Sequence, residues 1–352
     1  MTEITGGAAE AAPGYVARAE VRVSEAPVPL ESPSCLLCGG TDFTPVLTGV
    51  EDRVWHKPGR FTIARCAGCA FVMTRPRPTP EGLGFYYAEA YSGGAGAIDM
   101  RAFYTSWVGR LVNRYRLVTI EKVRKPSADD HILDVGCSQG FFLQAAREAV
   151  GCRTSGIDLD AGSIALAVDP AACAYHTGRL VDCTLPEGAF TVVTFFECLE
   201  HETDPVGALR AARRVLAPGG LCVVEVPNFG SPWRRVFGRS WMPLLIPQHL
   251  SHFTQPTLRA ALERAGFEVV HQQTMLFPIE MTASTGIWLG RLLGLRPVPA
   301  ADRGAGRKLL DAAIGLLLTV LFWTVEVPTQ FWLRVFGLAG HQTIIGRRPA
   351  VG

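Results

Sequence analysis

Ile132-Leu133-Asp134-Val135-Gly136-Cys137-Ser138-Gln139-Gly140-Phe141-Phe142-Leu143 is the stretch that decides the fold class of this chain. An apolar run ends in an acid, a glycine-bearing turn follows, and a helix is predicted from Phe141 to Val150. Glycine permits positive φ and the close approach of a ligand, and the start of a helix offers free N–H groups. A second apolar run ends at Asp158, about 20 residues further on, where nucleotide-binding βαβ units carry the acid that reads ribose hydroxyls. The pattern predicts an α/β fold that binds a nucleotide-like ligand.

The same residues resemble the first motif of the class I S-adenosylmethionine-dependent methyltransferases, an apolar run followed by an acid and three glycines at alternate positions. Here these positions read Asp134, Gly136, Ser138 and Gly140, so a small serine replaces the middle glycine. A dinucleotide-binding site would require Gly-x-Gly-x-x-Gly, a spacing that does not occur at this turn. The resemblance implies S-adenosylmethionine as the methyl donor and a Rossmann-like, seven-stranded sheet whose last strand is antiparallel.

Three further segments match that family in the same order along the chain. Phe190 to His201 resembles its fourth strand, which ends in a Glu-His pair beside the transferring methyl group. Leu216 to Leu221 resembles the turn before its fifth strand, and Gly178 to Asp182 resembles the segment that contacts adenine. The resemblance implies that the donor is bound by Asp134, Gly136, Ser138, Gly140, Asp158, Leu159, Asp182 and Phe196. Asp160 either joins this set or caps the helix that starts near Ala161.

Glu200, His201 and His249 are the residues that we expect to carry the chemistry. His249 and His252 lie in a polar loop after the fifth strand, at the strand ends where open α/β sheets bind ligands. Histidine accepts protons near neutral pH, so His201 and His249 are candidate bases, with Glu200 orienting His201 or holding the acceptor. Packing at the strand end is the alternative role for His201. The expected reaction is methyl transfer to a hydroxyl, and less readily to a carbon.

Four of the ten cysteines form two Cys-x-x-Cys knuckles, Cys35 with Cys38 and Cys66 with Cys69. Each knuckle places two thiolates on one tight turn, and Asp42 to Ala64 between them has the length of a β-hairpin. This spacing suits a tetrahedral zinc site with a structural role, because four thiolates leave no open coordination position. The alternatives are two disulfides, which a reducing cytosol disfavours, and a degenerate site that holds no metal.

The N-terminal part of the chain resembles bacterial methyltransferases, often linked to surface glycans, lipids or secondary metabolites, that carry a zinc ribbon before the catalytic domain. The shared features are the knuckles, the segment Arg75-Pro76-Arg77-Pro78-Thr79-Pro80 and a tyrosine-rich stretch. An amphipathic helix is predicted from Ile98 to Lys125, lying over the donor, with one side made of Leu111, Tyr115, Val118 and Val123. The predicted domains are a disordered tail (1–33), the zinc ribbon (34–80), a helical connector over the cofactor (81–127), the methyltransferase core (128–274 with 341–350) and a hydrophobic helical insertion (275–340).

The insertion contains an uncharged, apolar run from Ala312 to Val325. A helix of this length spans only about 21 Å, short of the roughly 30 Å hydrocarbon core. Glu326 and Pro328 are expected to interrupt it before a second apolar segment, Phe331 to Leu338. We favour a helical hairpin that lies in the membrane surface, over a lid on an apolar acceptor or a homodimer interface, and least of all a true span.

The net charge of the chain limits the kinds of binding partner that we expect. A formal net charge of +2 gives no electrostatic case for a polyanion, so a nucleic-acid partner is not expected and an RNA methyltransferase is disfavoured. The N-terminal residues lack the basic start and apolar core of a signal peptide. We expect a cytoplasmic enzyme, attached peripherally to the inner face of the membrane, that methylates a small, glycan or lipid-linked acceptor.

Two more functions are compatible with the same motifs. One is a C-methyltransferase that acts on a sugar or a secondary metabolite. The second is a non-catalytic protein that binds the donor or serves as a membrane scaffold, which the intact donor motifs disfavour.

Overall fold

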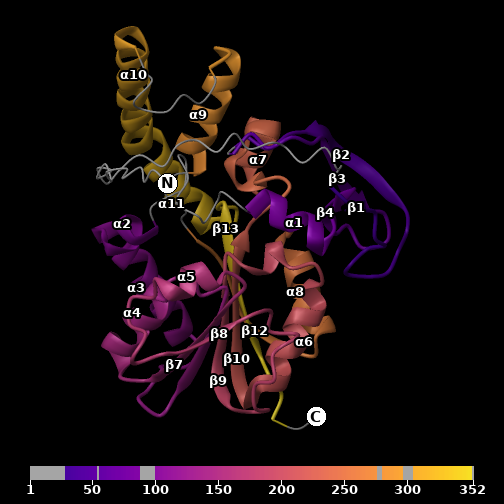
Figure 1. The fold of residues 1–352 in the computed structure, drawn as a ribbon, viewed down its shortest axis with the longest axis vertical. Coiled ribbons are helices and arrows are strands. Elements are labelled where there is room, and N and C mark those ends of the chain that lie inside the picture. The colour runs from indigo at the N-terminus through magenta and orange to yellow at the C-terminus, as the bar shows by residue number, and fades with distance from the viewer. Residues whose placement is uncertain (1–27, 54, 88–99, 276–279, 296–303, 351–352) are drawn as a thin grey trace, which may run out of the picture.

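The computed structural model describes residues 28–53, 55–87, 100–275, 280–295 and 304–350 (Figure 1). Its central feature is a sheet of seven strands in the order β12-β13-β10-β9-β6-β7-β8. In that order the strands span Glu268–Met275, His341–Arg347, Leu216–Pro227, Phe190–Phe196, His131–Val135, Arg153–Asp158 and Ala174–Thr177. β13 runs antiparallel to both β10 and β12, whereas β10, β9, β6, β7 and β8 pair in parallel. The predicted fold, with its antiparallel last strand, is confirmed.

Helices cover both faces of this sheet, because successive strand residues point to opposite sides and are apolar on both. Leu133 and Val193 pack with α6 and α8, whereas the adjacent Ile132 and Val192 pack with α3 and α4. Figure 1 shows these two layers on either side of the strands. The helices are α3 (Trp107–Glu121), α4 (Phe141–Val150), α5 (Ala161–Ala165), α6 (Pro205–Val215) and α8 (Gln255–Arg264).

The connector before the core differs from its prediction. Instead of one helix there are two, α2 (Met100–Thr105) and α3, separated at Ser106, whose side chain caps α3 by accepting from the Gly109 N–H. The predicted apolar side is also wrong, since Leu111 is 56% exposed. The buried side instead carries Arg116, which forms an ion pair with Glu225 on β10. A buried charged residue breaks the apolar periodicity from which the face was predicted.

The N-terminal part forms a ribbon built on a four-stranded sheet, in the order β11-β4-β3-β2. β2 (Phe43–Val50) and β3 (Phe61–Cys66) form the predicted hairpin, followed by β4 (Val72–Thr74). The fourth strand, β11 (Ser251–His252), comes from the loop after β10, so the ribbon and the core share a sheet. The first part of the predicted tail, 1–27, lies outside the described residues. Near the end of the predicted tail, Leu30–Glu31 forms strand β1, which pairs with β5 (Arg77–Pro78). Helix α1 (Pro80–Tyr87) follows β5 in the chain.

The insertion forms a hairpin of α9 and α10, which pack together and stand off the body of the protein at the top of Figure 1. α10 continues without a break through one π-helical turn into α11, so the predicted hairpin within residues 308–338 is wrong. These elements are α9 (Glu280–Leu292), α10 (Ala305–Leu321), the π-helical turn (Phe322–Glu326) and α11 (Val327–Val335). The continuous helix Ala305–Val335 is long and apolar enough to cross a membrane by length and composition alone.

Glu326 and Pro328 do not interrupt this helix, for two reasons. The Glu326 carboxylate accepts hydrogen bonds from the N–H groups of Met281 and Thr282, at 2.8 and 2.9 Å, and thereby caps the start of α9. Pro328 lies in the first turn of α11, after the π-helical turn has already altered the hydrogen-bond pattern. Glu326 therefore does not end the helix that begins with α10, and instead joins that helix to α9.

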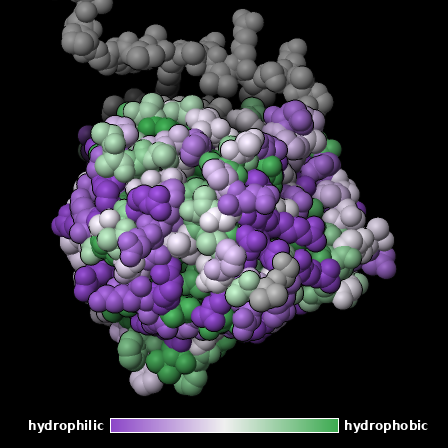
Figure 2. All heavy atoms as spheres, turned by 90° about the horizontal axis from the view of Figure 1, so that it is seen from below, coloured by the Kyte–Doolittle hydropathy of each residue, from purple (hydrophilic) through white to green (hydrophobic). Residues whose placement is uncertain are grey.

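The end of the molecule opposite the α9–α10 hairpin has a different surface. Figure 2 shows that hydrophilic residues cover most of this face, with apolar residues in smaller groups between them. Many exposed apolar side chains lie on α9, on α10 and on the segment that continues α10. They include Trp288, Leu292, Leu309, Leu316, Trp323, Trp332 and Phe336.

Candidate active site

The glycine-bearing turn between β6 and α4 is tightly packed against neighbouring loops. Gly136 and Gly140 have φ of +77° and +79°, and a Cβ on Gly140 would lie 2.0 Å from the Tyr175 hydroxyl. A Cβ on Gly136 would lie 2.6 Å from the Cys198 sulfur, which follows β9. Ser138 also adopts a positive φ, +48°. Both glycines are thus required by the backbone and by close approach, as the sequence predicts.

Asp158 stabilises this turn from the end of β7. Its carboxylate accepts hydrogen bonds from the N–H groups of Ser138, at 2.8 Å, and Asp160, at 2.9 Å, one on each oxygen. Each carboxylate oxygen keeps a free lone pair for a ligand hydroxyl. Burial raises the pKa of Asp158 from its usual value. Asp160 caps α5 by accepting from the Gly162 and Ser163 N–H groups, so the capping role considered for it is the one observed.

Asp134 lies beneath the turn and is only 4% exposed. Thr194 on β9 donates a hydrogen bond of 2.6 Å to its Oδ1, and burial raises the pKa of Asp134 to about 7. The buried Arg116–Glu225 ion pair lies close enough to act on its charge. The Arg116 guanidinium also stacks over Phe196, 4.4 Å from the ring centre. These contacts hold the ends of β6, β9 and β10 in fixed positions.

The remaining predicted donor-binding residues surround the same turn at the carboxyl ends of the strands. Leu159, directly after Asp158, has an apolar side chain that is 69% exposed. Phe196, at the end of β9, is buried against Phe142 of α4, with ring centres 4.7 Å apart. Asp182 is exposed in the segment after β8. The predicted donor-binding residues thus lie at or after the carboxyl ends of β6, β7, β8 and β9, and their contact with the donor stays a prediction.

Glu200, His201 and His249 meet at the end of β9, although His249 comes from a loop far along the chain. One ligand-type atom from each of the three lies within 4.8 Å of the others. The ring centres of His201 and His249 are 4.5 Å apart, and the His249 Nε2 atom is 3.8 Å from Glu200 Oε1. Glu200 and His249 are buried, at 1% and 6% exposure, and His201 is partly accessible. The three predicted catalytic residues are thus neighbours.

Both histidines are anchored through Nδ1. In His201 this atom lies 3.1 Å from the carbonyl oxygen of Gln248 and 2.8 Å from the Tyr87 hydroxyl. In His249 it lies 2.9 Å from the carbonyl oxygen of Pro243. Burial lowers the pKa of His201 to about 4 and lowers that of His249 well below its usual value, so both rings are neutral near pH 7. Burial also raises the pKa of Glu200 well above its ordinary range.

A second acid–histidine pair lies beside this group and was not predicted from the sequence. Glu197, in a left-handed conformation with φ of +54°, places Oε2 3.2 Å from His341 Nε2. His341 begins β13, and the charge of Glu197 raises its pKa against the opposing effect of burial. His252, in contrast, bonds to the Thr74 hydroxyl at 3.1 Å, and burial lowers its pKa to about 3. His252 joins the ribbon to the core and is not part of the group.

The four knuckle cysteines gather at one end of the ribbon, with their sulfurs within 4.8 Å of one another. The Cys35–Cys69 and Cys38–Cys66 sulfur pairs are each 3.5 Å apart. This is far longer than a disulfide bond of about 2.05 Å, and close to the separation of thiolates around a zinc ion at about 2.3 Å from each. The Gly40 backbone N–H lowers the pKa of the Cys38 thiol to about 7. The residues present therefore fit a zinc site with four cysteine ligands.

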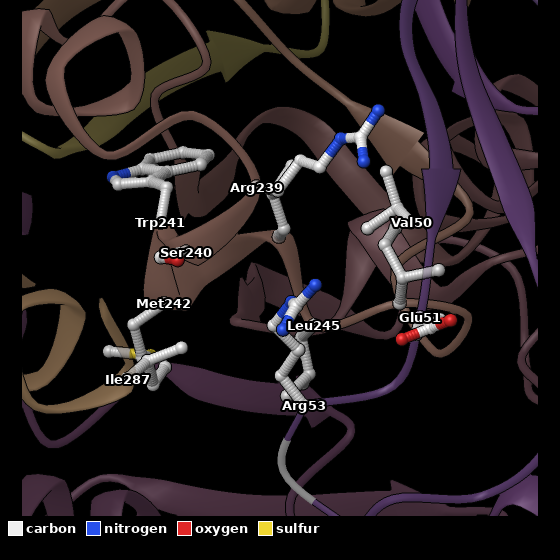
Figure 3. A pocket seen from close by; sticks show the side chains of 11 residues that line it. Val50, Glu51, Arg53, Arg239, Ser240, Trp241, Met242, Leu245 and Ile287 are labelled. Carbon is white, nitrogen blue, oxygen red and sulfur yellow. The ribbon is translucent and has the colours of Figure 1, made fainter. Parts of the chain in front are cut away.

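A further pocket lies between the ribbon and the base of α9, on the loop that also carries His249 (Figure 3). Arg53 from the ribbon and Arg239 from the loop line it, together with Trp241 and with Ile287 of α9. Burial lowers the pKa of Arg53 and the charges of Arg291 and Arg239 lower it further, whereas the carboxylate of Glu51, which lines the same pocket, raises it. Three guanidinium groups therefore lie near one another here, beneath the apolar hairpin.

Comparison with known proteins identifies the family. Residues 102–272 match a family described as a methyltransferase domain. A ubiquinone biosynthesis O-methyltransferase of Thiobacillus denitrificans is 33% identical over 172 residues, covering 45% of this chain and 72% of the relative. A probable S-adenosylmethionine-dependent methyltransferase of Mycolicibacterium smegmatis is 30% identical over 154 residues, covering 43% of this chain and 57% of the relative.

Solved structures share the fold. A phosphoethanolamine N-methyltransferase of Haemonchus contortus, in complex with phosphomonomethylethanolamine and S-adenosylhomocysteine, aligns with a TM-score of 0.50 at 14% identity. The alignment covers 79% of this chain and 63% of that one. With the seven-stranded sheet and the donor turn, these matches establish that the chain belongs to the class I S-adenosylmethionine-dependent methyltransferases. It is an enzyme that uses S-adenosylmethionine, as the sequence predicts.

Proposed function

We propose that this enzyme transfers the methyl group of S-adenosylmethionine to a hydroxyl oxygen of its acceptor. The observation that carries the proposal is the meeting of Glu200, His201 and His249 at the end of β9, next to the strand ends that form the donor turn. The relatives named for O-methylation in ubiquinone biosynthesis support oxygen as the acceptor atom.

The chain's residues mainly align the two reactants. The bound donor supplies an electrophilic methyl group on a sulfonium sulfur, so binding and orientation provide most of the rate enhancement. Asp158 offers its free lone pairs to the ribose hydroxyls, and the turn at Gly136 and Gly140 allows the donor to approach the backbone. We assign the removal of the acceptor proton to His201 or His249, whose rings are neutral near pH 7 and able to accept a proton at Nε2. Glu200 orients these rings or holds the acceptor.

We infer that the acceptor combines an apolar part with an anionic or polar part, as a lipid-linked glycan does. The pocket in Figure 3 is lined by Arg53 and Arg239, and also by one acid, Glu51, so two basic side chains and one acidic side chain lie where an anionic or polar group of the acceptor is proposed to bind. The same loop that lines this pocket continues to His249, whose N–H donates to the carbonyl of Leu245 at 2.9 Å. The apolar hairpin rises directly from the pocket through Ile287 of α9.

The α9–α10 hairpin supports peripheral attachment to the cytoplasmic face of a membrane. α11 is fixed to the protein body by Glu326 and by Gln330, whose amide donates to Glu280 at 3.0 Å. The 17 residues of α10, which precede this attachment, span about 25 Å, less than the roughly 30 Å hydrocarbon core. The tip of the hairpin also carries Arg307 and Lys308, which prefer the headgroup region. The hairpin is therefore proposed to lie in the membrane surface.

The ribbon cysteines are proposed to hold a structural zinc ion. Four thiolates would fill its coordination sphere, so the ion supplies rigidity and no chemistry. Its effect reaches the catalytic loop because Thr74, on β4, donates its hydroxyl to the carbonyl oxygen of His249 at 2.8 Å. The ribbon thus fixes the position of one of the proposed catalytic residues.

The experiment that tests the proposed function follows the methyl group. The full chain is incubated with methyl-labelled S-adenosylmethionine and separate lipid, glycan, small-molecule and RNA fractions. We expect label in the lipid or glycan fraction, in an ether-linked form that resists mild base. Label confined to RNA, or attached to carbon, would contradict the proposal. Asp158→Asn serves as the control that removes donor binding without touching the acceptor side.

A further inference from the structure

We propose that Glu200, His201 and His249 form a binding site for a divalent transition-metal ion, which holds the acceptor oxygen beside the methyl donor. This inference rests on the proposed function, since it names how the same three residues activate the acceptor. Their ligand-type atoms lie within 4.8 Å of one another, so small side-chain movements would bring all three within about 2.0–2.2 Å of one shared ion.

The hydrogen bonds of both histidines involve Nδ1, so Nε2 of each ring is left to bind a metal ion. A carbonyl oxygen only accepts, so the Gln248 carbonyl at 3.1 Å and the Pro243 carbonyl at 2.9 Å place the ring proton on Nδ1 of His201 and His249. The lone pair of each ring is then on Nε2. Metal-binding histidines show this arrangement, in which the other nitrogen donates to a backbone carbonyl. The His249 Nε2 atom is directed at Glu200, 3.8 Å from Oε1.

Glu200 supplies the second, independent observation. Its side chain is 1% exposed, and neither carboxylate oxygen has a hydrogen-bond partner among the described residues. A buried polar group without a partner is costly, and native proteins nearly always satisfy it. Within the described part of the chain, the nearest polar atom printed for this carboxylate is the unprotonated His249 Nε2, 3.8 Å from Oε1, and not a hydrogen-bond donor. A cation shared by Glu200 and the two histidines satisfies all three groups at once.

The donor set selects the kind of ion. Two imidazole nitrogens and one carboxylate oxygen suit Mn²⁺, Fe²⁺, Co²⁺ or Zn²⁺, and leave open positions for water and for acceptor oxygens. The ribbon differs, because its four soft thiolates favour zinc. Manganese therefore reports on the Glu–His–His group without competing for the ribbon.

The ion changes the role of the histidines from bases to ligands. A hydroxyl bound to a divalent ion loses its proton more readily, as metal-bound water does, and the proton passes to solvent water. The resulting oxygen forms a bond to the methyl carbon while the carbon–sulfur bond breaks. The sulfur leaves as a neutral thioether, and the methylated oxygen, now uncharged, dissociates from the ion.

Manganese binding tests the site without an acceptor. The zinc-loaded full chain is titrated with Mn²⁺, and free Mn²⁺ is followed by electron paramagnetic resonance. We expect one bound equivalent, with affinity lowered at least tenfold in Glu200→Gln and His249→Ala. Tyr87→Phe removes the hydroxyl that contacts His201 Nδ1, and should weaken binding by about tenfold or less. His271→Ala, on β12 and away from the group, is the matched control and should bind as the wild type does.

Calorimetric donor affinity shows that each variant is folded. Absence of saturable Mn²⁺ binding to the wild type, or equal binding by Glu200→Gln and His249→Ala, would overturn the metal site. If Mn²⁺ binds but no fraction is methylated on oxygen, the proposed function fails while the metal site stands. If oxygen is methylated at the full rate by protein that binds no Mn²⁺, the metal site fails and the histidines act as bases.

Discussion

The backbone N–H of Leu250 donates to the carbonyl oxygen of Glu200 at 2.9 Å, and this bond fixes the catalytic loop to the end of β9. The Leu250 carbonyl in turn accepts from the N–H of Thr74 on the ribbon, at 3.0 Å. The ribbon, the loop and the end of β9 are thus joined in one row of hydrogen bonds. The position of His249 relative to Glu200 depends on this row, which makes the ribbon part of the active-site scaffold.

Zinc removal should therefore affect catalysis more than donor binding. We expect chelation, or Cys66→Ser, to loosen the ribbon and displace the loop, because so small a module has little apolar core of its own. Fluorescence of the buried Trp241, which packs in the same cluster as Phe61 of β3, should change. Methyl transfer should fall while calorimetric donor affinity holds.

The matched control for the zinc prediction is Cys183→Ser, a partly buried cysteine outside the knuckles. It should leave metal content, fluorescence and activity unchanged. Protein purified without chelator that contains no zinc by elemental analysis, yet is folded and active, would refute the structural-zinc assignment.

Asp158 is expected to contribute strongly to donor affinity. Asp158→Asn keeps the shape of the side chain but loses charge-assisted hydrogen bonds worth about 1.5–3 kcal/mol. This corresponds to roughly a 10- to 150-fold rise in the dissociation constant of S-adenosylhomocysteine, measured by calorimetry. Glu148→Gln, on the exposed side of α4, is the control. An unchanged affinity in Asp158→Asn would refute the assigned contact.

Asp134 should make stability depend on pH in the ligand-free protein. Its pKa is about 7 in the folded state and about 3.9 in the unfolded state, so the fold holds the proton more tightly. The stability from this group is fully present below about pH 4 and is lost as pH rises through 7. Relative to Asp134→Asn, the wild type should lose up to about 4 kcal/mol of unfolding free energy between pH 4 and 8, measured in urea. If the difference in unfolding free energy between the wild type and Asp134→Asn does not change with pH, the pKa of Asp134 in the folded protein is ordinary and the prediction is wrong.

The donor turn was predictable because its determinants are local. The positive φ of Gly136 and Gly140, and the acid that receives the Ser138 N–H, follow one another within a single βαβ unit. The Glu197–His341 pair was not predictable in this way. Its two residues meet only because β13 inserts between β10 and β12, and nothing near either residue signals the other.

Errors in the helical segments share one physical cause. The face of α3 was predicted from apolar spacing, yet Arg116 is buried because Glu225 neutralises it from another strand. Glu326 looked like a helix breaker, yet it caps α9. A charged residue is read as exposed when its partner lies elsewhere in the sequence, and only the three-dimensional structure supplies that partner.

Attachment to membranes should depend on the exposed apolar side of α10. Leu316 is 68% exposed, and Leu316→Glu places a charge on this surface without touching the protein core. We expect the wild type to float with liposomes and Leu316→Glu to float much less, with donor affinity unchanged. High salt should weaken attachment only in part, because apolar burial carries most of it. Leu166→Glu, at a 58% exposed position on the body, is the matched control.

Light scattering decides between membrane attachment and self-association for the same helix. A wild type that stays in the supernatant after flotation but is dimeric, and becomes monomeric in Leu316→Glu, would show that the apolar hairpin is an oligomer interface. If the wild type is monomeric and does not float, both roles are contradicted. The remaining role for the apolar hairpin is then to cover the bound acceptor as a lid.

Catalysis should be lost when the group at the end of β9 is disrupted. His201→Ala and His249→Ala each remove a ring that either accepts the acceptor proton or binds an ion that promotes its loss, and turnover should fall by about 10²–10⁴-fold. Donor affinity should hold, because Asp158 and the glycine turn are unaffected. His271→Gln should behave as the wild type. The measurement is initial-rate transfer of labelled methyl to the fraction identified as acceptor, over a range of pH. Near-normal turnover in both variants would leave alignment of donor and acceptor as the whole mechanism.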